Sequence, residues 1–208
     1  MRPNDNRLFH TRRGFLATAA AAGGCLAARP WPAAEKPSEK AQICLTLDLE
    51  MSRHYPQRGI FEWDFQKGNL DDATKRYAVK AGELVRDRGG IIHYFCVARV
   101  LEQPDVAWLK QLAKTGHPIG NHTYDHVNVK ATTVPSVQFR FKRAPWLAGG
   151  RKPPQLIRDN IQLADAALSM RAGIQSRGFR TPGGFHSGLD ERPDLQKMLQ
   201  ELGFTWIS

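Results

Sequence analysis

Cysteine is scarce in this chain, and its arrangement excludes a disulfide scaffold. The 208 residues contain three cysteines, none of them in a CxxC pair. Cys44 and Cys96 lie in apolar runs, so we expect both to be buried as small hydrophobic residues. Repeats at the periods of solenoid proteins are also missing. These absences favour one globular domain, with or without an appendage.

An excess of acidic charge is absent as well. The chain carries 30 Lys and Arg against 20 Asp and Glu, a net charge of +10. Residues 1–34 hold five Arg and one Asp, which leaves a net charge of +6 for the rest. We interpret the remaining basic residues as scattered, without a stripe that alternates them with aromatic residues, and expect no nucleic-acid partner. A mildly basic protein suits attraction to anionic envelope polymers.

The N-terminal segment has the composition of an export signal. "TRRGFL" places Arg12 and Arg13 before an Ala-rich run, "ATAAAAGGCLAA". This arrangement resembles the signal peptide of the twin-arginine route, which carries folded proteins across the bacterial inner membrane. The apolar run is too short for a membrane-spanning helix.

We therefore expect a signal peptide at 1–34, a polar linker at 35–42 and a folded domain at 43–208. The mature chain would be periplasmic or extracellular and would contain no transmembrane span. Two alternatives remain open: an ordinary basic tail before an Ala-rich helix, and a lipid anchor at Cys25.

Beyond the linker, short apolar runs alternate with amphipathic segments. Strands are predicted at 43–50, 91–97, 117–122, 176–184 and 204–208, and helices at 71–90, 103–116, 153–173 and 193–203. This alternation indicates an α/β protein with parallel βαβ units, in an open sheet or a barrel.

Polar residues follow three of the predicted strands. In a barrel of this class, such positions carry the chemistry. Asp48 and Glu50 end the first strand and, two residues apart, project to the same side. His122 and His126 follow the third strand at a spacing that one face of a helical turn would bring to a single ion. Arg180 follows the fourth strand. Each residue alone has a structural explanation, but their coincidence at one edge favours a metal site.

Three short motifs, in order, resemble those of the polysaccharide deacetylases, the NodB-homology enzymes of carbohydrate esterase family 4. They are "TLDLE" at 46–50, "HTYDH" at 122–126 and "RTP" at 180–182. The resemblance runs from about residue 41 to the C-terminus. It implies a NodB-like irregular (β/α) barrel.

The resemblance also implies roles for four of these residues. His122, His126 and Glu50 would bind a divalent ion, most simply Zn²⁺, with water at the open position. Asp48 would be the general base. The assignment of Asp48 as base and Glu50 as ligand could also be reversed.

Two further positions correspond to the family's third motif and its surroundings. Arg180 would hold the carboxylate of the base. Gly183 stands where the family usually has Tyr, and its backbone N–H would still donate to the oxyanion. In the family, the general-acid histidine lies in a motif close to the last strand. No counterpart is found before Ser208, so we expect a barrel that is incomplete at the C-terminus.

The resemblance thus implies a metal-dependent hydrolase that removes N- or O-acetyl groups from an acetylated polysaccharide or envelope glycan. Two other functions stay open. One is a truncated relative that binds metal or glycan without turnover, and the other is an amidohydrolase of small linear amides on the same fold.

Overall fold

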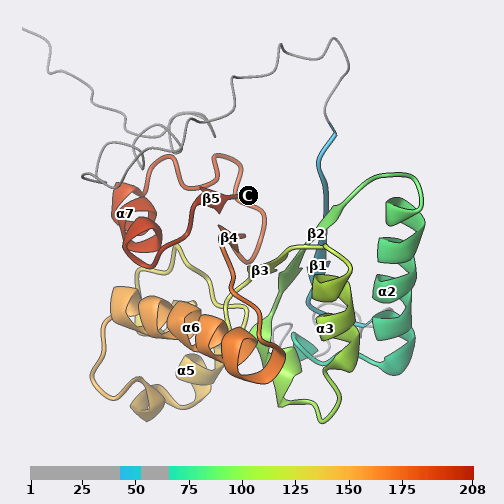
Figure 1. Cartoon of the computed structure of the whole chain (residues 1–208). Helices are drawn as coiled ribbons and strands as arrows, with labels where there is room; N and C mark the ends of the chain where they lie inside the picture. Colours follow the sequence, from blue (N-terminus) through green and yellow to red (C-terminus); the bar gives the residue numbers. More distant parts are fainter. Residues whose placement is uncertain (1–42, 53–65) are drawn as a thin grey trace, which may run out of the picture.

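The structure is a computed structural model that describes residues 43–52 and 66–208. The predicted signal peptide at 1–34 and linker at 35–42 lie outside the described residues. Figure 1 shows a sheet with helices packed against its outer side.

Five parallel strands form this sheet in the order β1-β2-β3-β4-β5, so each strand lies beside its neighbour in sequence. They are β1 (Leu45–Leu49), β2 (Ile92–Cys96), β3 (Ile119–Asn121), β4 (Gly178–Phe179) and β5 (Trp206–Ile207). All five predicted strands are present, and the parallel βαβ prediction is confirmed. Within the described residues, β1 and β5 are the two edges, so the sheet is open, and it curves into an arc.

The arc is strongly curled. The ring of Trp206 on β5 lies 4.4 Å from that of His93 and 5.3 Å from that of Phe95, both on β2. In a flat sheet, strands three places apart would be separated by about 14 Å. Gly178 on β4 permits the contact, because a Cβ there would lie 2.6 Å from the Trp206 ring. The inner face of the arc is therefore filled by aromatic side chains.

Helices connect the strands on the outer side. The long ones are α2 (Asp72–Arg86), α3 (Ala107–Lys114), α6 (Pro153–Ala167) and α7 (Pro193–Glu201). Shorter elements are η2 (Ala98–Glu102), α4 (Val134–Val137), α5 (Phe139–Arg143), η3 (Pro145–Ala148) and the π-helical η4 (Leu168–Ala172). None of the described helices is long and apolar enough to cross a membrane.

Two predictions about helix boundaries need correction. The helix expected from residue 103 begins at Ala107, after a turn in which the Asp105 side chain accepts a hydrogen bond from the Ala107 N–H at 2.8 Å. The helix expected over 153–173 changes to a π-helical turn at Leu168 before it ends at Gly173, which has φ 69°.

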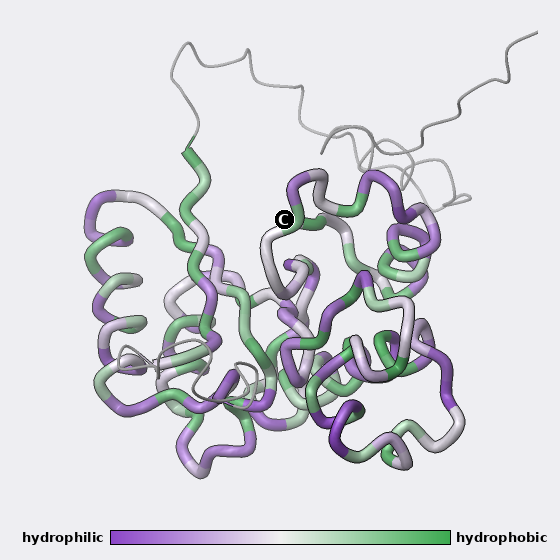
Figure 2. Tube along the Cα trace, turned by 180° about the vertical axis from the view of Figure 1, so that it is seen from behind, coloured by the Kyte–Doolittle hydropathy of each residue, from purple (hydrophilic) through white to green (hydrophobic). Residues whose placement is uncertain are grey.

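The core consists of two clusters. The first lies between β1–β3 and the helices α2 and α3, and the second between β4–β5 and the helices α6 and α7. Cys96 is buried as predicted, but the prediction for Cys44 is wrong, because Cys44 is exposed. It lies just before β1, where Ile43, Leu45 and Leu47 are exposed too. Figure 2 shows the hydrophobic start of this edge strand.

A buried amide links β3 to α6. The Asn121 side chain donates to the Ile161 carbonyl at 3.0 Å and to Asp165 Oδ1 at 2.9 Å. Burial raises the pKa of Asp165 to about 6, against an ordinary value of 3.8, although the Asn121 hydrogen bond opposes this shift. The folded protein therefore favours the protonated carboxyl, and the stability that this provides is lost as the pH rises through about 6.

We therefore predict that Asp165→Asn stabilises the protein at about pH 8 but has little effect at about pH 4. The amide is neutral at both pH values and keeps the oxygen that accepts from Asn121. The gain at the higher pH should be on the order of 1 kcal/mol, since partial exposure screens the charge. Urea unfolding at the two pH values measures it, with the exposed Asp190→Asn as control. A gain that does not depend on pH would contradict the prediction.

Candidate metal centre

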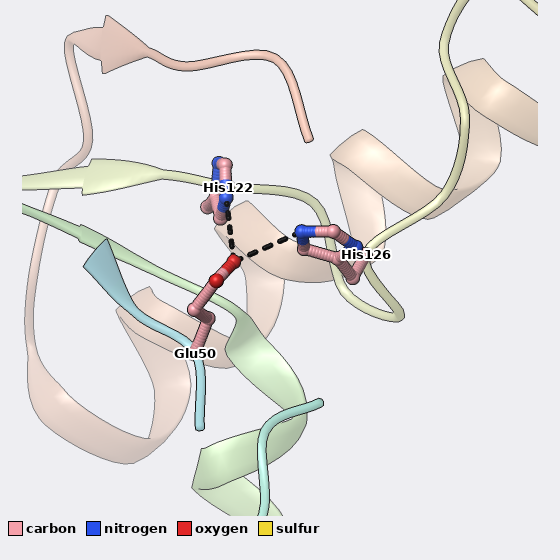
Figure 3. Close-up of side chains that lie close together, drawn as sticks. All are labelled: Glu50, His122 and His126. Atoms are coloured by element: carbon pink, nitrogen blue, oxygen red, sulfur yellow. Dashed lines mark hydrogen bonds and ion pairs between the residues drawn. The ribbon is translucent and has the colours of Figure 1, made fainter. Parts of the chain in front are cut away.

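Three side chains from different parts of the chain converge at the C-terminal ends of β1 and β3. Glu50 follows β1, and His122 and His126 belong to the loop after β3. Glu50 Oε2 lies 3.3 Å from His122 Nε2 and 2.9 Å from His126 Nε2. Figure 3 shows both imidazoles pointing at this carboxylate. The structure thus brings all three predicted ligands together.

The tautomer of His122 is fixed by its other ring nitrogen. Nδ1 lies 2.9 Å from the Arg180 carbonyl oxygen, which can only accept, so Nδ1 carries a proton. In a neutral ring, Nε2 then directs a lone pair at the Glu50 carboxylate. Two acceptors face one another in this way only when a cation lies between them or the ring is protonated. A backbone carbonyl that orients an imidazole from behind is typical of metal-binding histidines.

The donor set fits a small divalent ion. Its three ligand atoms all lie within 4.8 Å of one another. Ligands of a tetrahedral Zn²⁺ at ordinary bond lengths would be about 3.3 Å apart, close to the separations from Glu50. Burial alone would raise the pKa of Glu50, but hydrogen bonds with His122, His126 and Lys67 outweigh it and hold that pKa well below its usual range. The carboxylate is therefore ionised and able to bind a cation.

The histidine loop is not helical, contrary to the interpretation of the spacing. Thr123 and His126 both have left-handed backbones, with φ 62° and φ 57°. Non-glycine residues adopt this conformation only where the surroundings stabilise it. The Thr123 hydroxyl accepts from the Val127 N–H at 3.1 Å, and Asn121 Oδ1 accepts from the Thr123 N–H at 2.7 Å. These bonds hold the two imidazoles with ring centroids 5.2 Å apart.

Asn160 on α6 supports the same loop from behind. Its Oδ1 accepts from the backbone N–H groups of Tyr124 at 2.9 Å and Asp125 at 3.0 Å. Its Nδ2 donates to Asp125 Oδ2 at 3.0 Å. Sequence analysis missed this residue. The available signal was a polar side chain among the buried positions Ile157, Ile161 and Ala164 of the helix.

Asp48 lies beside the three candidate ligands. Arg180 Nη1 donates to Asp48 Oδ1 at 2.8 Å, and Asp48 Oδ2 is 4.0 Å from His122 Nε2. One carboxylate oxygen is thus held by the guanidinium while the other faces the centre. Arg180 therefore contacts the site twice, through its side chain to Asp48 and through its carbonyl to His122.

Lys67 is a site residue that sequence analysis missed. Its Nζ lies 2.6 Å from Glu50 Oε1, and its side chain is only 3% exposed. The ammonium engages one oxygen of Glu50 and leaves Oε2 for the histidines. Lys67 precedes α2 in a segment without helical or strand periodicity, so no sequence pattern indicated it.

The remaining predicted residue, Gly183, lies on the exposed loop after β4. Its φ of 82° is in the left-handed region, where a side chain such as Tyr would be strained. No hydrogen bond joins Gly183 to the candidate ligands among the described residues. His186, farther along the same loop, is exposed.

A sequence model of the family described as Polysaccharide deacetylase matches residues 69–207. The chain belongs to the polysaccharide deacetylase family. The matched region contains "HTYDH" and "RTP" but begins after "TLDLE", so the assignments of Asp48 and Glu50 depend on the geometry above. No curated protein sequence matches the chain.

Solved structures agree on the fold of this deacetylase-family chain. It is similar to a Streptococcus mutans CE4 esterase, with 19% identity over 79% of this chain and 54% of that one, at a TM-score of 0.50. It is also similar to a mutant of BA3943, a CE4 family pseudoenzyme of Bacillus anthracis, with 16% identity over 82% and 45% and the same TM-score. The chain thus spans about half of each structure. These similarities confirm the predicted NodB-like α/β fold.

We predict that Asn160→Ala lowers the free energy of unfolding by about 1–3 kcal/mol, because two loop N–H groups lose their acceptor. Urea denaturation measures this change. The control is Asn128→Ala in the exposed part of the following segment, where the side chain accepts from the Lys130 N–H. Equal effects of the two substitutions would show that Asn160 does not stabilise the loop.

Proposed function

We propose that this chain is a metal-dependent deacetylase of an acetylated polysaccharide or envelope glycan. The observation that supports it most directly is the convergence of Glu50, His122 and His126, with the His122 Nδ1 proton fixed by a backbone carbonyl. Family membership supports the same reaction class. The three residues would hold the ion, with Zn²⁺ as the simplest choice.

A divalent ion held there would polarise the acetyl carbonyl and lower the pKa of a water molecule. Asp48 would accept the proton of the attacking water through Oδ2, while Arg180 holds the other carboxylate oxygen in position. The backbone N–H of Gly183 would donate to the developing oxyanion. The new C–O bond would form first, and the C–N bond of an amide or the C–O bond of an ester would then break as the leaving nitrogen or oxygen takes up a proton, which releases acetate and the free amine or hydroxyl of the sugar.

Two other functions differ from this proposal in what they release. A non-catalytic relative would bind metal or glycan without turnover, and one of the matched structures is described as a pseudoenzyme. An amidohydrolase would act on small linear amides but not on acetylated sugars. Acetate release from an oligosaccharide therefore separates the proposed function from both.

The first prediction is that the full chain loaded with Zn²⁺ binds about one ion and releases acetate from an acetylated chitooligosaccharide or xylan fragment. His122→Ala/His126→Ala should bind no ion by elemental analysis and release no acetate. His186→Ala is the control, because that exposed histidine should affect neither measurement. A filled site without acetate release would overturn the deacetylase proposal, and unchanged metal content in the double variant would overturn the metal site.

The second prediction separates base from ligand. Asp48→Asn should leave metal content nearly intact, because the amide oxygen still accepts from Arg180, and should reduce the rate on the order of 10²–10⁴-fold. Glu50→Gln should lower metal affinity first, with activity partly restored by excess Zn²⁺. Metal content and acetate release are measured for both variants. Loss of metal in Asp48→Asn together with its retention in Glu50→Gln would reverse the two roles.

We further propose that Arg12 and Arg13 direct export by the twin-arginine route to the periplasm or beyond. The pair lies before a short Ala-rich apolar run, as such signals require. Replacing both residues by Lys should leave the precursor in the cytoplasm after cell fractionation. Normal appearance of this variant in the periplasm would contradict the proposal.

A further inference from the structure

The positive charge of the folded part of the chain is concentrated in one segment. Residues 127–152 contain six basic residues and no Asp or Glu; the six are Lys130, Arg140, Lys142, Arg143, Arg151 and Lys152. Residues 35–126 hold 13 basic and 13 acidic residues, and residues 153–208 hold six of each. This segment therefore accounts for the whole net charge of +6 outside residues 1–34. The interpretation of the basic residues as scattered was wrong.

Several apolar residues of the segment are buried and anchor it to the core. Val129, Val137 and Ala148 are buried in the second core cluster with α6 and α7. The two basic residues near the end of α5, Lys142 and Arg143, are exposed. The core thus fixes the backbone of a basic surface.

An aromatic residue accompanies these charges. Trp146 on η3, three residues after Arg143, is 75% exposed, and its neighbour Leu147 is 50% exposed. Among the large hydrophobic side chains of this segment, these two are the exposed ones. We call Lys142, Arg143 and Trp146 the basic-aromatic surface. It combines cations with a flat ring that is accessible to solvent.

The helix α5, which carries Lys142 and Arg143, is attached at its start to the loop of the candidate metal centre. Gln138 Nε2 donates to the Asp125 carbonyl at 3.2 Å, and Arg140 Nη2 donates to Asp125 Oδ1 at 2.6 Å. Asp125 immediately precedes the candidate ligand His126. In Figure 1, α5 lies at the lower end of the molecule, the end toward which β1 runs. A polymer bound along α5 and η3 would therefore lie on the segment that contacts the histidine loop.

We propose that the basic-aromatic surface binds an anionic polysaccharide, with Lys142 and Arg143 on its carboxylate or phosphate groups and Trp146 stacked on a sugar ring. This inference rests on the proposed function, to which it adds a preference for acidic over neutral glycans. A membrane surface fits less well, because one exposed Trp and one exposed Leu provide little apolar area for insertion. A nucleic acid would share the charge but has no place in a deacetylation site.

The test uses polygalacturonate as an acidic glycan and polyglutamate as a polyanion without sugar rings. The full chain should bind polygalacturonate more tightly in isothermal titration calorimetry at low salt. Lys142→Gln/Arg143→Gln should weaken this binding on the order of tenfold. Lys110→Gln/Lys114→Gln is the matched control, because both residues are exposed on α3 and the change in net charge is the same. Trp146→Ala should reduce the preference for polygalacturonate over polyglutamate.

The binding test stays independent of catalysis when it is repeated with His122→Ala/His126→Ala. If that variant binds polygalacturonate as tightly as the wild type does, the proposed glycan binding is supported even if the protein releases no acetate. Equal losses in the α5 variant and the α3 control would overturn the proposal, as would equal affinity for the two polymers. Tighter binding to anionic lipid vesicles or to DNA than to polygalacturonate, lost with Lys142 and Arg143, would instead assign the surface to a membrane or a nucleic acid.

Discussion

The guanidinium of Arg180 is the contact on which both the curled sheet and the candidate site depend. Its Nη2 donates to Thr46 Oγ1 on β1 at 2.7 Å and to Ser208 Oγ just after β5 at 2.8 Å. It also stacks on Phe95 of β2, with 4.3 Å between Cζ and the ring centroid. One planar cation therefore joins the first strand, the second strand and the end of the last. Only Arg offers this number of directed donors together with a face that packs on an aromatic ring.

Charge is balanced closely around the centre. Glu50 forms an ion pair with Lys67 through Oε1 and contacts the imidazoles of His122 and His126 through Oε2. Asp48 forms an ion pair with Arg180 through Oδ1. Each carboxylate thus keeps one oxygen in a fixed ion pair and directs the other inward. Removal of Lys67, whose side chain is 3% exposed, would leave the Glu50 carboxylate without its buried partner and is expected to be unfavourable. The arrangement limits which substitutions the strand ends tolerate.

The sequence predicted the strands and the residues at their ends, because both leave local signals. Apolar runs mark parallel strands; Asp48 lies near the end of such a run, and His122 and Arg180 directly follow two others. Contacts across the fold leave no such signal. Lys67 contacts Glu50 from 17 positions away in the sequence, and Asn160 supports the histidine loop from a helix 36 residues away. The exposure of Cys44 depends on the edge position of β1, which composition does not reveal.

The edge formed by β1 has a consequence for handling the protein. Among the described residues, β1 pairs only with β2, so one row of its backbone N–H and C=O groups faces no other strand. The alternate residues Ile43, Leu45 and Leu47 are exposed beside this row. An unpaired apolar edge is a template for adding a strand from another molecule. Self-association by strand addition should therefore begin at β1 as the protein is concentrated, and a charged residue in place of Leu45 or Leu47 is the natural way to block it.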